Sequence, residues 1–280
     1  DLIESGRITE AARSLPTPSV ENLESLDRRE RDRAMMIYHF GQSAVVKSTT
    51  PSPVIIPRQL AVPAFWLSNA FGKPPILSYC SYALNNWKRV DPAQDIVLDN
   101  LELLQNFVRV YDEDWFILPH VAIERQAADV IESGVLASWL ASIRNDHLLW
   151  HMLSDINSGI QGMTKILRRI PEKCSRDVYY KEVRPWIGPF VDVIYEGVSD
   201  VPVTYRGETG AQSSVVPFIV GLLGLKHKQT GMTDHLQDMR GYMPPLHREF
   251  LEWIERNSLI RKAVTETRFV NLKEMYNQCL

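Results

Sequence analysis

The sequence contains few cysteines and no apolar segment long enough to cross a membrane. Its three cysteines are Cys80, Cys174 and Cys279, and an odd, sparse set without CxxC spacing cannot form a disulfide framework. The longest apolar run, residues 215–225, is interrupted by Pro217 and falls well short of the roughly 20 residues that span a bilayer. We therefore expect a cytoplasmic protein that is not inserted in a membrane.

An excess of either charge is also absent. Lys and Arg number 31 and Asp and Glu 34, which gives a formal net charge of -3, so no general field attracts phosphate backbones or anionic lipids. Nucleic acid and membrane surfaces are therefore not expected partners. The 14 glycines and 17 prolines are too few for a low-complexity chain. A length of 280 residues favours about two domains.

The spacing of the apolar residues predicts a mostly α-helical fold. Apolar side chains recur at three- and four-residue steps over residues 126–169, which indicates one very long helix or two stacked ones. The same spacing predicts further helices at 179–186, 215–225, 235–242, 246–257 and from 272 to the end. No alternation of strands and helices is found, so we expect the second part of the chain to be entirely helical.

The first part of the chain is predicted to be smaller and less regular. Four prolines between residues 47 and 63 favour an extended connection. Helices are expected over residues 65–71 and 76–87, and another is expected to begin at Asp99 or Asn100 and to run through Phe107. The polar patch at residues 111–114 is the best candidate for a boundary. We predict a small N-terminal domain over 1–108 and a large helical domain over 109–280.

The common catalytic signatures are missing: the sequence has no GxSxG, GxGxxG, GxxxxGK[ST] or HExxH. His147, His151 and Asp155 lie at i, i+4 and i+8, where they could bind a divalent metal. A polar stripe on the outer face of a helix is the simpler interpretation, and we prefer it.

Two other patterns leave a structural and a functional interpretation open. Residues 207–214, GETGAQSS, offer backbone amides and hydroxyls before an apolar helix, and these could cap the helix or hold a polar ligand. The segment with Tyr179, Tyr180, Arg184 and Trp186 could bind an amino acid, with Arg184 on the carboxylate and the rings against a flat group. It could equally be a surface arginine beside core aromatics.

A longer motif favours the functional interpretations. Residues 236–251 read LQDMRGYMPPLHREFL and resemble the signature LQDMRxYMPxxHRxFL of the indoleamine 2,3-dioxygenase family. The chain resembles a fungal- or bacterial-type member of that family. Shorter matches occur in the family's order at 60–63 (LAVP), 74–77 (PPIL), 86–88 (NWK), 195–197 (YEG) and 210–214 (GAQSS). The resemblance implies a monomeric cytoplasmic protein in which the small domain covers the distal side of heme b, and heme b lies between helices of the large domain.

The resemblance also implies a reaction. The family inserts O2 across the indole C2–C3 bond of tryptophan or a related indoleamine and gives N-formylkynurenine, the first step of the kynurenine pathway. The cofactor carries the oxygen chemistry, and no side chain is expected to act as an obligatory acid or base. The alternative is a heme-free homologue that binds an indole or amino acid, or that catalyses a different reaction on it.

Site residues carry over by position in the motifs. Arg184 matches the arginine that binds the substrate carboxylate. The remaining substrate-binding positions are Tyr179, Tyr180, Tyr79, Tyr82, Phe116, Thr209 and Gly210. The heme-contacting positions are Thr209, Gly210, Ala211 and Tyr180.

Three departures from the family pattern stand out. Glu208 replaces a glycine of the loop and is expected either to face solvent or to bind the substrate ammonium. Val220 stands where some members carry an acidic residue near a heme propionate. The family's proximal histidine lies about three turns beyond the position of Cys279, so we expect the metal ligand beyond Leu280. Heme b is the expected cofactor, and two alternatives stay open: the chain as given holds it or lacks it.

His120, near the distal-pocket segment, is expected to be a buried histidine that supports its neighbours, although a contact to substrate is the other possibility.

Overall fold

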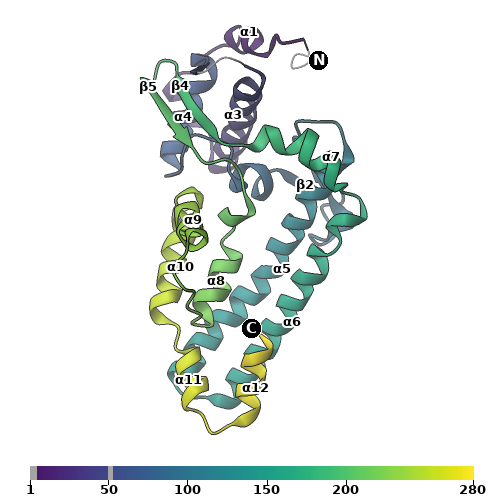
Figure 1. Ribbon diagram of the computed structural model, residues 1–280, viewed down its shortest axis with the longest axis vertical. Coiled ribbons are helices and arrows are strands. Elements are labelled where there is room, and N and C mark those ends of the chain that lie inside the picture. The colour runs from purple at the N-terminus through teal and green to yellow at the C-terminus, as the bar shows by residue number, and fades with distance from the viewer. Residues whose placement is uncertain (1–4, 50–52) are drawn as a thin grey trace.

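The computed structural model describes residues 5–49 and 53–280. Figure 1 shows a mostly helical molecule with a small sheet and the N-terminal helices at one end and α11 and α12 at the other. Two long helices, α5 and α6, run between these ends side by side. The predicted mostly α-helical fold class is confirmed.

The N-terminal helices are α1 (Ile8–Arg13), α2 (Val20–Ser25), α3 (Arg28–Ser48) and α4 (Arg58–Ala70). A capping box starts α3, because the side chains of Asp27 and Glu30 each accept a hydrogen bond from the other's backbone N–H. The expected extended connection over 47–63 is wrong from Arg58 onward, since α4 contains Pro63. Proline has a helix-compatible φ, so this early position costs little beyond one backbone hydrogen bond. Residues 50–52 lie outside the described part.

The segment before the long helices holds little regular structure. Its elements are β1 (Val54–Ile56), a π-helical turn η1 (Cys80–Leu84), β2 (Trp87–Arg89), η2 (Leu98–Asn100) and β3 (Leu101–Leu103). The helix expected at 76–87 is shortened to the π-helical turn at Cys80–Leu84, because Trp87 belongs to β2. The helix expected after Asn100 is wrong, because β3 pairs antiparallel with β2. The buried side chain of Asn86 stabilises this pairing: it donates to the carbonyl oxygen of Gln105 and accepts from its N–H. The spacing of apolar residues does not predict this contact between a side chain and a distant backbone.

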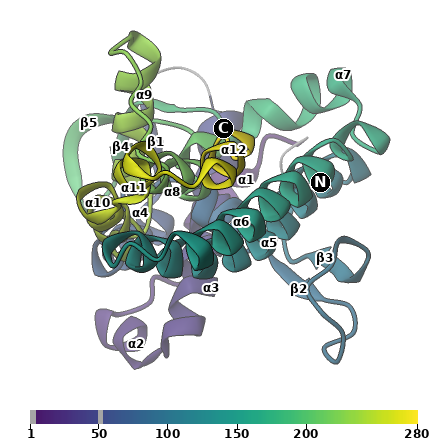
Figure 2. The same cartoon turned by 90° about the horizontal axis from the view of Figure 1, so that it is seen from below.

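Two stacked helices form the scaffold of the second half. α5 (Tyr111–Ser142) and α6 (Asp146–Leu167) pack along their length, so the two-helix alternative for residues 126–169 is confirmed. The turn between them is made by Arg144, which has a φ of 58°, and by Asn145, whose side chain accepts from the N–H of Leu148. Figure 2 shows the pair from below as two adjacent rods.

The next segment leaves the helical bundle and returns to the N-terminal end. It contains η3 (Ile170–Glu172), α7 (Arg176–Val178), η4 (Tyr179–Val183), η5 (Arg184–Ile187), β4 (Phe190–Tyr195) and β5 (Ser199–Tyr205). β4 pairs with β5 in an antiparallel hairpin and with β1 in parallel. The expectation that 109–280 is entirely helical is wrong at this hairpin, whose β-branched and aromatic residues favour strands. Nothing in the structure tests the boundary near 108, which stays a prediction.

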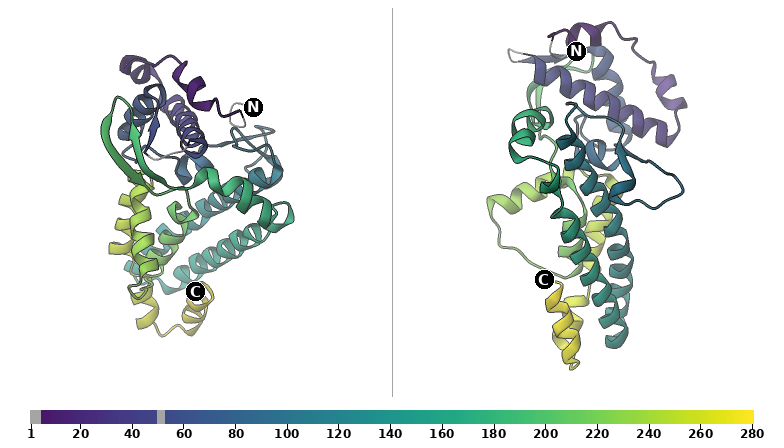
Figure 3. Two further views of the ribbon diagram at one scale, coloured as in Figure 1. Left: turned by 45° about the horizontal axis from the view of Figure 1, so that its top comes forward. Right: turned by 90° about the vertical axis from the view of Figure 1, so that its right-hand side faces the viewer.

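The C-terminal elements are η6 (Gly210–Gln212), α8 (Val215–Leu222), α9 (Gly231–Met239), η7 (Arg240–Tyr242), α10 (Pro245–Asn257), α11 (Ile260–Glu266) and α12 (Val270–Gln278). They pack against α5 and α6 around a core that includes Leu149, Ile156, Phe218, Ile254 and Leu272. Figure 3 shows α8–α10 below the sheet, next to the long helices. Within residues 5–49 and 53–280, none of the helices combines the length and the apolar character that a membrane crossing requires.

Candidate functional site

The predicted site is built around the loop that joins β5 to α8, residues 206–214. Gly207 allows this loop to approach the η5 segment, because a Cβ at this position would lie 2.5 Å from the carbonyl carbon of Gly188 and from the carbonyl oxygen of Ile187. The N–H of Glu208 donates to the same Ile187 oxygen at 2.9 Å. The first half of the loop is therefore held by backbone contacts that a side chain at 207 would break.

The second half of the loop is held by polar side chains. Gln212 is 3% exposed; its Oε1 accepts from the N–H of Tyr79, and its amide nitrogen donates to the carbonyl oxygen of Gly207. The hydroxyl groups of Ser213 and Tyr79 both donate to Oε1 of Glu124 on α5, at 2.7 and 3.0 Å. These bonds connect the loop, the start of η1 and α5 into one network.

Aromatic side chains line the adjacent face of α5. The rings of Phe116 and Tyr179 are stacked with centroids 4.0 Å apart, and His120 lies 4.8 Å from Phe116 and edge-on to Tyr79. Nδ1 of His120 is 2.7 Å from the carbonyl oxygen of Phe116, so it donates its proton there. Burial lowers the His120 pKa, which favours the neutral ring. The expectation of a buried, supporting histidine agrees with these contacts.

Tyr82 lies behind this group, fully buried and fixed by Glu113. Its hydroxyl donates to Oε1 of Glu113 at 3.0 Å, and the N–H groups of Phe107 and Val108 also donate to that carboxylate. Burial raises the pKa of Glu113 to about 7, although these three hydrogen bonds oppose the shift. Tyr82 and Glu113 thus position the 105–110 loop beside the site.

Arg184 and Glu208 form the charged end of the site. Nη1 of Arg184 donates to the backbone carbonyl of Glu208 at 3.0 Å and lies 3.9 Å from its carboxylate. The Glu208 side chain is 4% exposed and that of Arg184 43%, so the solvent-facing alternative for Glu208 is wrong. Burial raises the pKa of Glu208 to about 7, and Arg184 opposes this shift. Burial is the main cause that raises the pKa values of Tyr79, Tyr82 and Tyr179, and the Glu208 charge adds to it.

The remaining predicted residues are more accessible. Thr209 accepts a hydrogen bond from the N–H of Ala211, and a Cβ at Gly210 would meet nothing within 4 Å. Tyr180 is 73% exposed, so the structure does not bring it to the stacked pair formed by its neighbour Tyr179 and Phe116.

A cavity of about 550 Å³ adjoins the loop on the side of α8 and α9. Its lining combines loop residues with apolar side chains and a few polar ones: Gly210, Ala211, Ser213, Val216, Pro217, Val220, His227, Thr233, Leu236, Gln237 and Arg240. Val216 and Leu236 are 66% and 42% exposed, so the cavity presents apolar surface without a protein partner. Volume and lining are those of a site for a largely apolar ligand, and they fit a flat group of the size of heme b.

The histidines divide between the cavity and other places. His227 lines the cavity, and His247 is 2.8 Å from the Ser214 hydroxyl. His39 is enclosed by two serines. His147 and His151 are exposed along α6, which confirms the polar stripe; no group of three or more metal-binding side chains occurs within residues 5–49 and 53–280.

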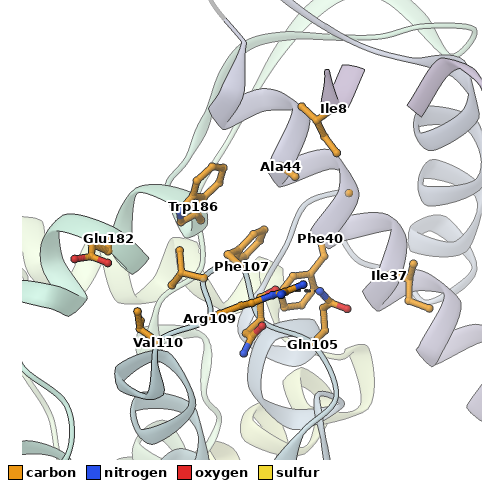
Figure 4. Close-up of a pocket in the computed structure, with 13 residues that line it drawn as sticks. Ile8, Ile37, Phe40, Ala44, Gln105, Phe107, Arg109, Val110, Glu182 and Trp186 are labelled. Atoms are coloured by element: carbon orange, nitrogen blue, oxygen red, sulfur yellow. Dashed lines mark hydrogen bonds between the residues drawn. The ribbon is translucent and has the colours of Figure 1, made fainter. Parts of the chain in front are cut away.

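A second cavity, of about 760 Å³, lies between α3, the 105–110 loop and the η4–η5 segment. Figure 4 shows the rings of Phe40, Phe107 and Trp186 along its wall and Arg109 across it. Its described lining includes Trp186 from the candidate segment but none of the residues carried over from the family as substrate- or heme-binding positions. We therefore treat it as separate from the Arg184 site.

Fold and site together define a class: a helical protein with a large, mostly apolar cavity and, beside it, a cluster of buried and half-buried aromatic rings and carboxylates next to an arginine that is partly exposed. The model of the family "Indoleamine 2,3-dioxygenase" matches residues 1–280. The chain belongs to this family, and the resemblance seen in the sequence is confirmed.

Three relatives show how the family varies. Indoleamine 2,3-dioxygenase 1 of Rattus norvegicus is 30% identical over all of this chain and 71% of its own length. Indoleamine 2,3-dioxygenase 2 of Homo sapiens is 32% identical over 81% of this chain and 57% of its own. A protein named myoglobin, from Haliotis madaka, is 28% identical over 80% of this chain and 60% of its own. Family membership is thus compatible with more than one named activity, and the site residues have to decide between them.

Sequence reasoning missed the residues that hold the site together. Glu124, Gln212 and Glu113 were not singled out, although each organises a predicted substrate residue or loop. A signal existed for Glu124, which lies at i+4 from His120 and i+8 from Phe116 on one predicted helix face. None existed for Glu113, whose partners come from the preceding loop.

Proposed function

We propose that the protein is a heme-dependent dioxygenase that acts on tryptophan or a related indoleamine and forms N-formylkynurenine. The observation that carries this proposal is the position of Arg184: its Nη1 donates to the loop at Glu208, and the turn just before it holds Tyr179 stacked on Phe116. A guanidinium next to aromatic rings can hold the carboxylate and the flat side chain of one aromatic amino acid. Heme b, when bound, would supply the oxygen chemistry.

The chain's own residues would bind and orient the substrate. Arg184 would pair with the carboxylate, Phe116 and Tyr179 would pack on the indole, and Thr209 and Gly210 would allow the substrate backbone to approach the loop. Val216, Val220, Leu236 and Ala211, which line the cavity, would hold heme b. Positioning of this kind contributes to rate by holding the reactants together, and no side chain needs to transfer a proton as an obligatory base. Tyr180 would have to turn inward to take part.

The name of the Haliotis relative favours a second candidate, reversible oxygen binding without a substrate. Such a protein requires the cavity that would bind heme but does not require Arg184, because it binds no amino acid. A heme-free homologue requires the indole-binding residues but does not require the cavity. The two parts of the site can therefore be tested separately. The cytoplasmic location and the monomeric state remain predictions.

The experiment is an absorption titration of the protein produced with heme supplied, recorded under reducing conditions before and after addition of L-tryptophan. We expect a Soret band that shifts saturably with tryptophan in the wild type and much less in Arg184→Leu. A Soret band that does not respond would favour oxygen binding alone. Absence of the band, with tryptophan still bound by calorimetry, would favour a heme-free role.

A further inference from the structure

The charged end of the site contains the carboxylate of Glu208. Arg184 is proposed to bind the carboxylate of the substrate, and this role gives no reason for a second carboxylate beside it. Glu208 is 3% exposed, and within the described ranges its carboxylate has one charged neighbour, Nη1 of Arg184 at 3.9 Å. That separation allows attraction but is too long for a hydrogen bond. A buried carboxylate is costly unless donors satisfy it, so this one is short of hydrogen-bond donors.

The backbone that carries this carboxylate is also held in place. The Glu208 N–H donates to Ile187, its carbonyl oxygen accepts from Arg184, and a Cβ at Gly207 would clash with the chain at Gly188. Residue 208 therefore cannot shift its main chain without breaking the contacts that position Arg184. A fixed backbone lowers the cost of placing the carboxylate against a ligand.

Resting on the proposed function, we propose that Glu208 binds the ammonium group of the substrate and that Arg184 and Glu208 together select indoles that carry an ammonium. An amino acid presents a carboxylate and an ammonium on the same carbon, and the two protein charges offer the complementary pair at neighbouring positions. The substrate ammonium would supply the donors that Glu208 lacks. A decarboxylated indoleamine would retain this contact, whereas an indole acid without an amine would leave Glu208 unsatisfied and add a second carboxylate beside it.

Calorimetric titration of the heme-loaded protein with three probes, L-tryptophan, tryptamine and indole-3-propionate, tests this selection. In Glu208→Gln we expect the affinity for tryptophan and tryptamine to fall about ten- to a hundred-fold, the range for a lost charge-assisted bond, while that for indole-3-propionate stays equal or rises. Glu208→Asp, which keeps the charge, should retain the preference for amines. Glu132→Gln, at an exposed position on α5, is the matched control.

A second measurement needs no variant. Arg184 is the charged group that the structure places against Glu208. The phenols of Tyr79, Tyr82 and Tyr179, on which the Glu208 charge acts, stay neutral in this pH range because burial raises their pKa values. In the wild type, the ratio of tryptamine to indole-3-propionate affinity should therefore fall as the pH drops through about 7, where Glu208 becomes protonated.

The outcomes separate this inference from the proposed function. If Glu208→Gln binds all three probes as the wild type does, or loses all three equally, and the wild-type ratio is flat with pH, the role of Glu208 is wrong. If the amine preference holds but no oxygenated product forms, the dioxygenase assignment fails and the ammonium site remains. If the wild type binds none of the probes, both are wrong.

Discussion

The hydroxyl of Tyr79 donates to Oε1 of Glu124 at 3.0 Å, and the Ser213 hydroxyl donates to the same oxygen at 2.7 Å. One carboxylate on α5 thereby holds two segments that lie 134 positions apart (213 − 79) in the sequence. Burial raises the pKa of Glu124 and the two hydroxyl donors oppose that shift. The placement of the loop at residues 207–213 thus depends on a residue that contacts neither end of the charged pair.

Replacing Tyr79 with Phe tests this network. The change removes one donor from a half-buried carboxylate, so we expect the free energy of unfolding to fall by about 1–2 kcal/mol. Urea unfolding of the variant measures the loss. Tyr111→Phe, at a 52% exposed position, is the control and should change stability by less than about 0.5 kcal/mol. Equal effects in the two variants would argue against the network.

Replacing Arg184 with Leu tests the carboxylate contact. We expect tryptophan binding to weaken by about 2–4 kcal/mol, because the variant leaves a substrate carboxylate without its partner. Arg184→Lys should recover part of the loss, since it keeps the charge but not the planar fork. Calorimetry measures both variants, and an unchanged affinity in Arg184→Leu would refute the assignment.

Gly207→Ala tests the close approach of the loop to η5. A Cβ here would overlap backbone atoms of Ile187 and Gly188 at 2.5 Å, and backbone cannot move aside easily. We expect a loss of about 1–3 kcal/mol in unfolding free energy together with weaker tryptophan binding. Gly241→Ala is the control, because nothing lies within 4 Å of its added methyl. A stable Gly207→Ala variant with wild-type binding would contradict the described contact.

His39 should make stability depend on pH. Its ring nitrogens lie 3.1 and 2.9 Å from the hydroxyl oxygens of Ser81 and Ser68, and burial with nearby Lys73 lowers its pKa from 6.5 to about 3. Between about pH 3 and 6.5, His39 is therefore protonated in the unfolded chain and neutral in the folded chain. This stabilisation is complete above pH 6.5 and is lost as the pH falls, by about 1.4 kcal/mol between about pH 7.5 and 5.5.

The measurement is chemical unfolding at both pH values for the wild type, His39→Gln and His235→Gln. The His39 variant should show a pH difference smaller by about 1.4 kcal/mol, whereas the exposed His235 should not alter it. If His39→Gln keeps the wild-type pH difference, the buried ring is not the source.

The sequence predicted the helices with long apolar periods and the motif residues that identify the family. α5 and α6 were expected because their apolar spacing persists over many turns. The pairing of β2 with β3 was not expected, because it depends on Asn86 meeting the backbone of Gln105, a contact that apolar spacing does not encode. The β4–β5 hairpin was missed although its β-branched residues favour strands.

The candidate site shows the same division. Arg184 and the loop at 207–213 could be found from the motif, since they carry over by position. The two alternatives for Glu208 could not be separated by sequence, because its burial follows from contacts with Ile187 and Arg184. Tyr180 shows a difference of another kind: the motif places it in the pocket, whereas its side chain on the short η4 turn is exposed, and its part in binding stays a prediction.

The most direct test of the account is incubation of the heme-loaded, reduced protein with L-tryptophan under isotopically labelled O2, followed by mass analysis of the product. The account predicts N-formylkynurenine that carries both labelled oxygen atoms, and its loss in Arg184→Leu. A heme-loaded protein that binds O2 and tryptophan yet returns tryptophan unchanged would contradict the proposed function.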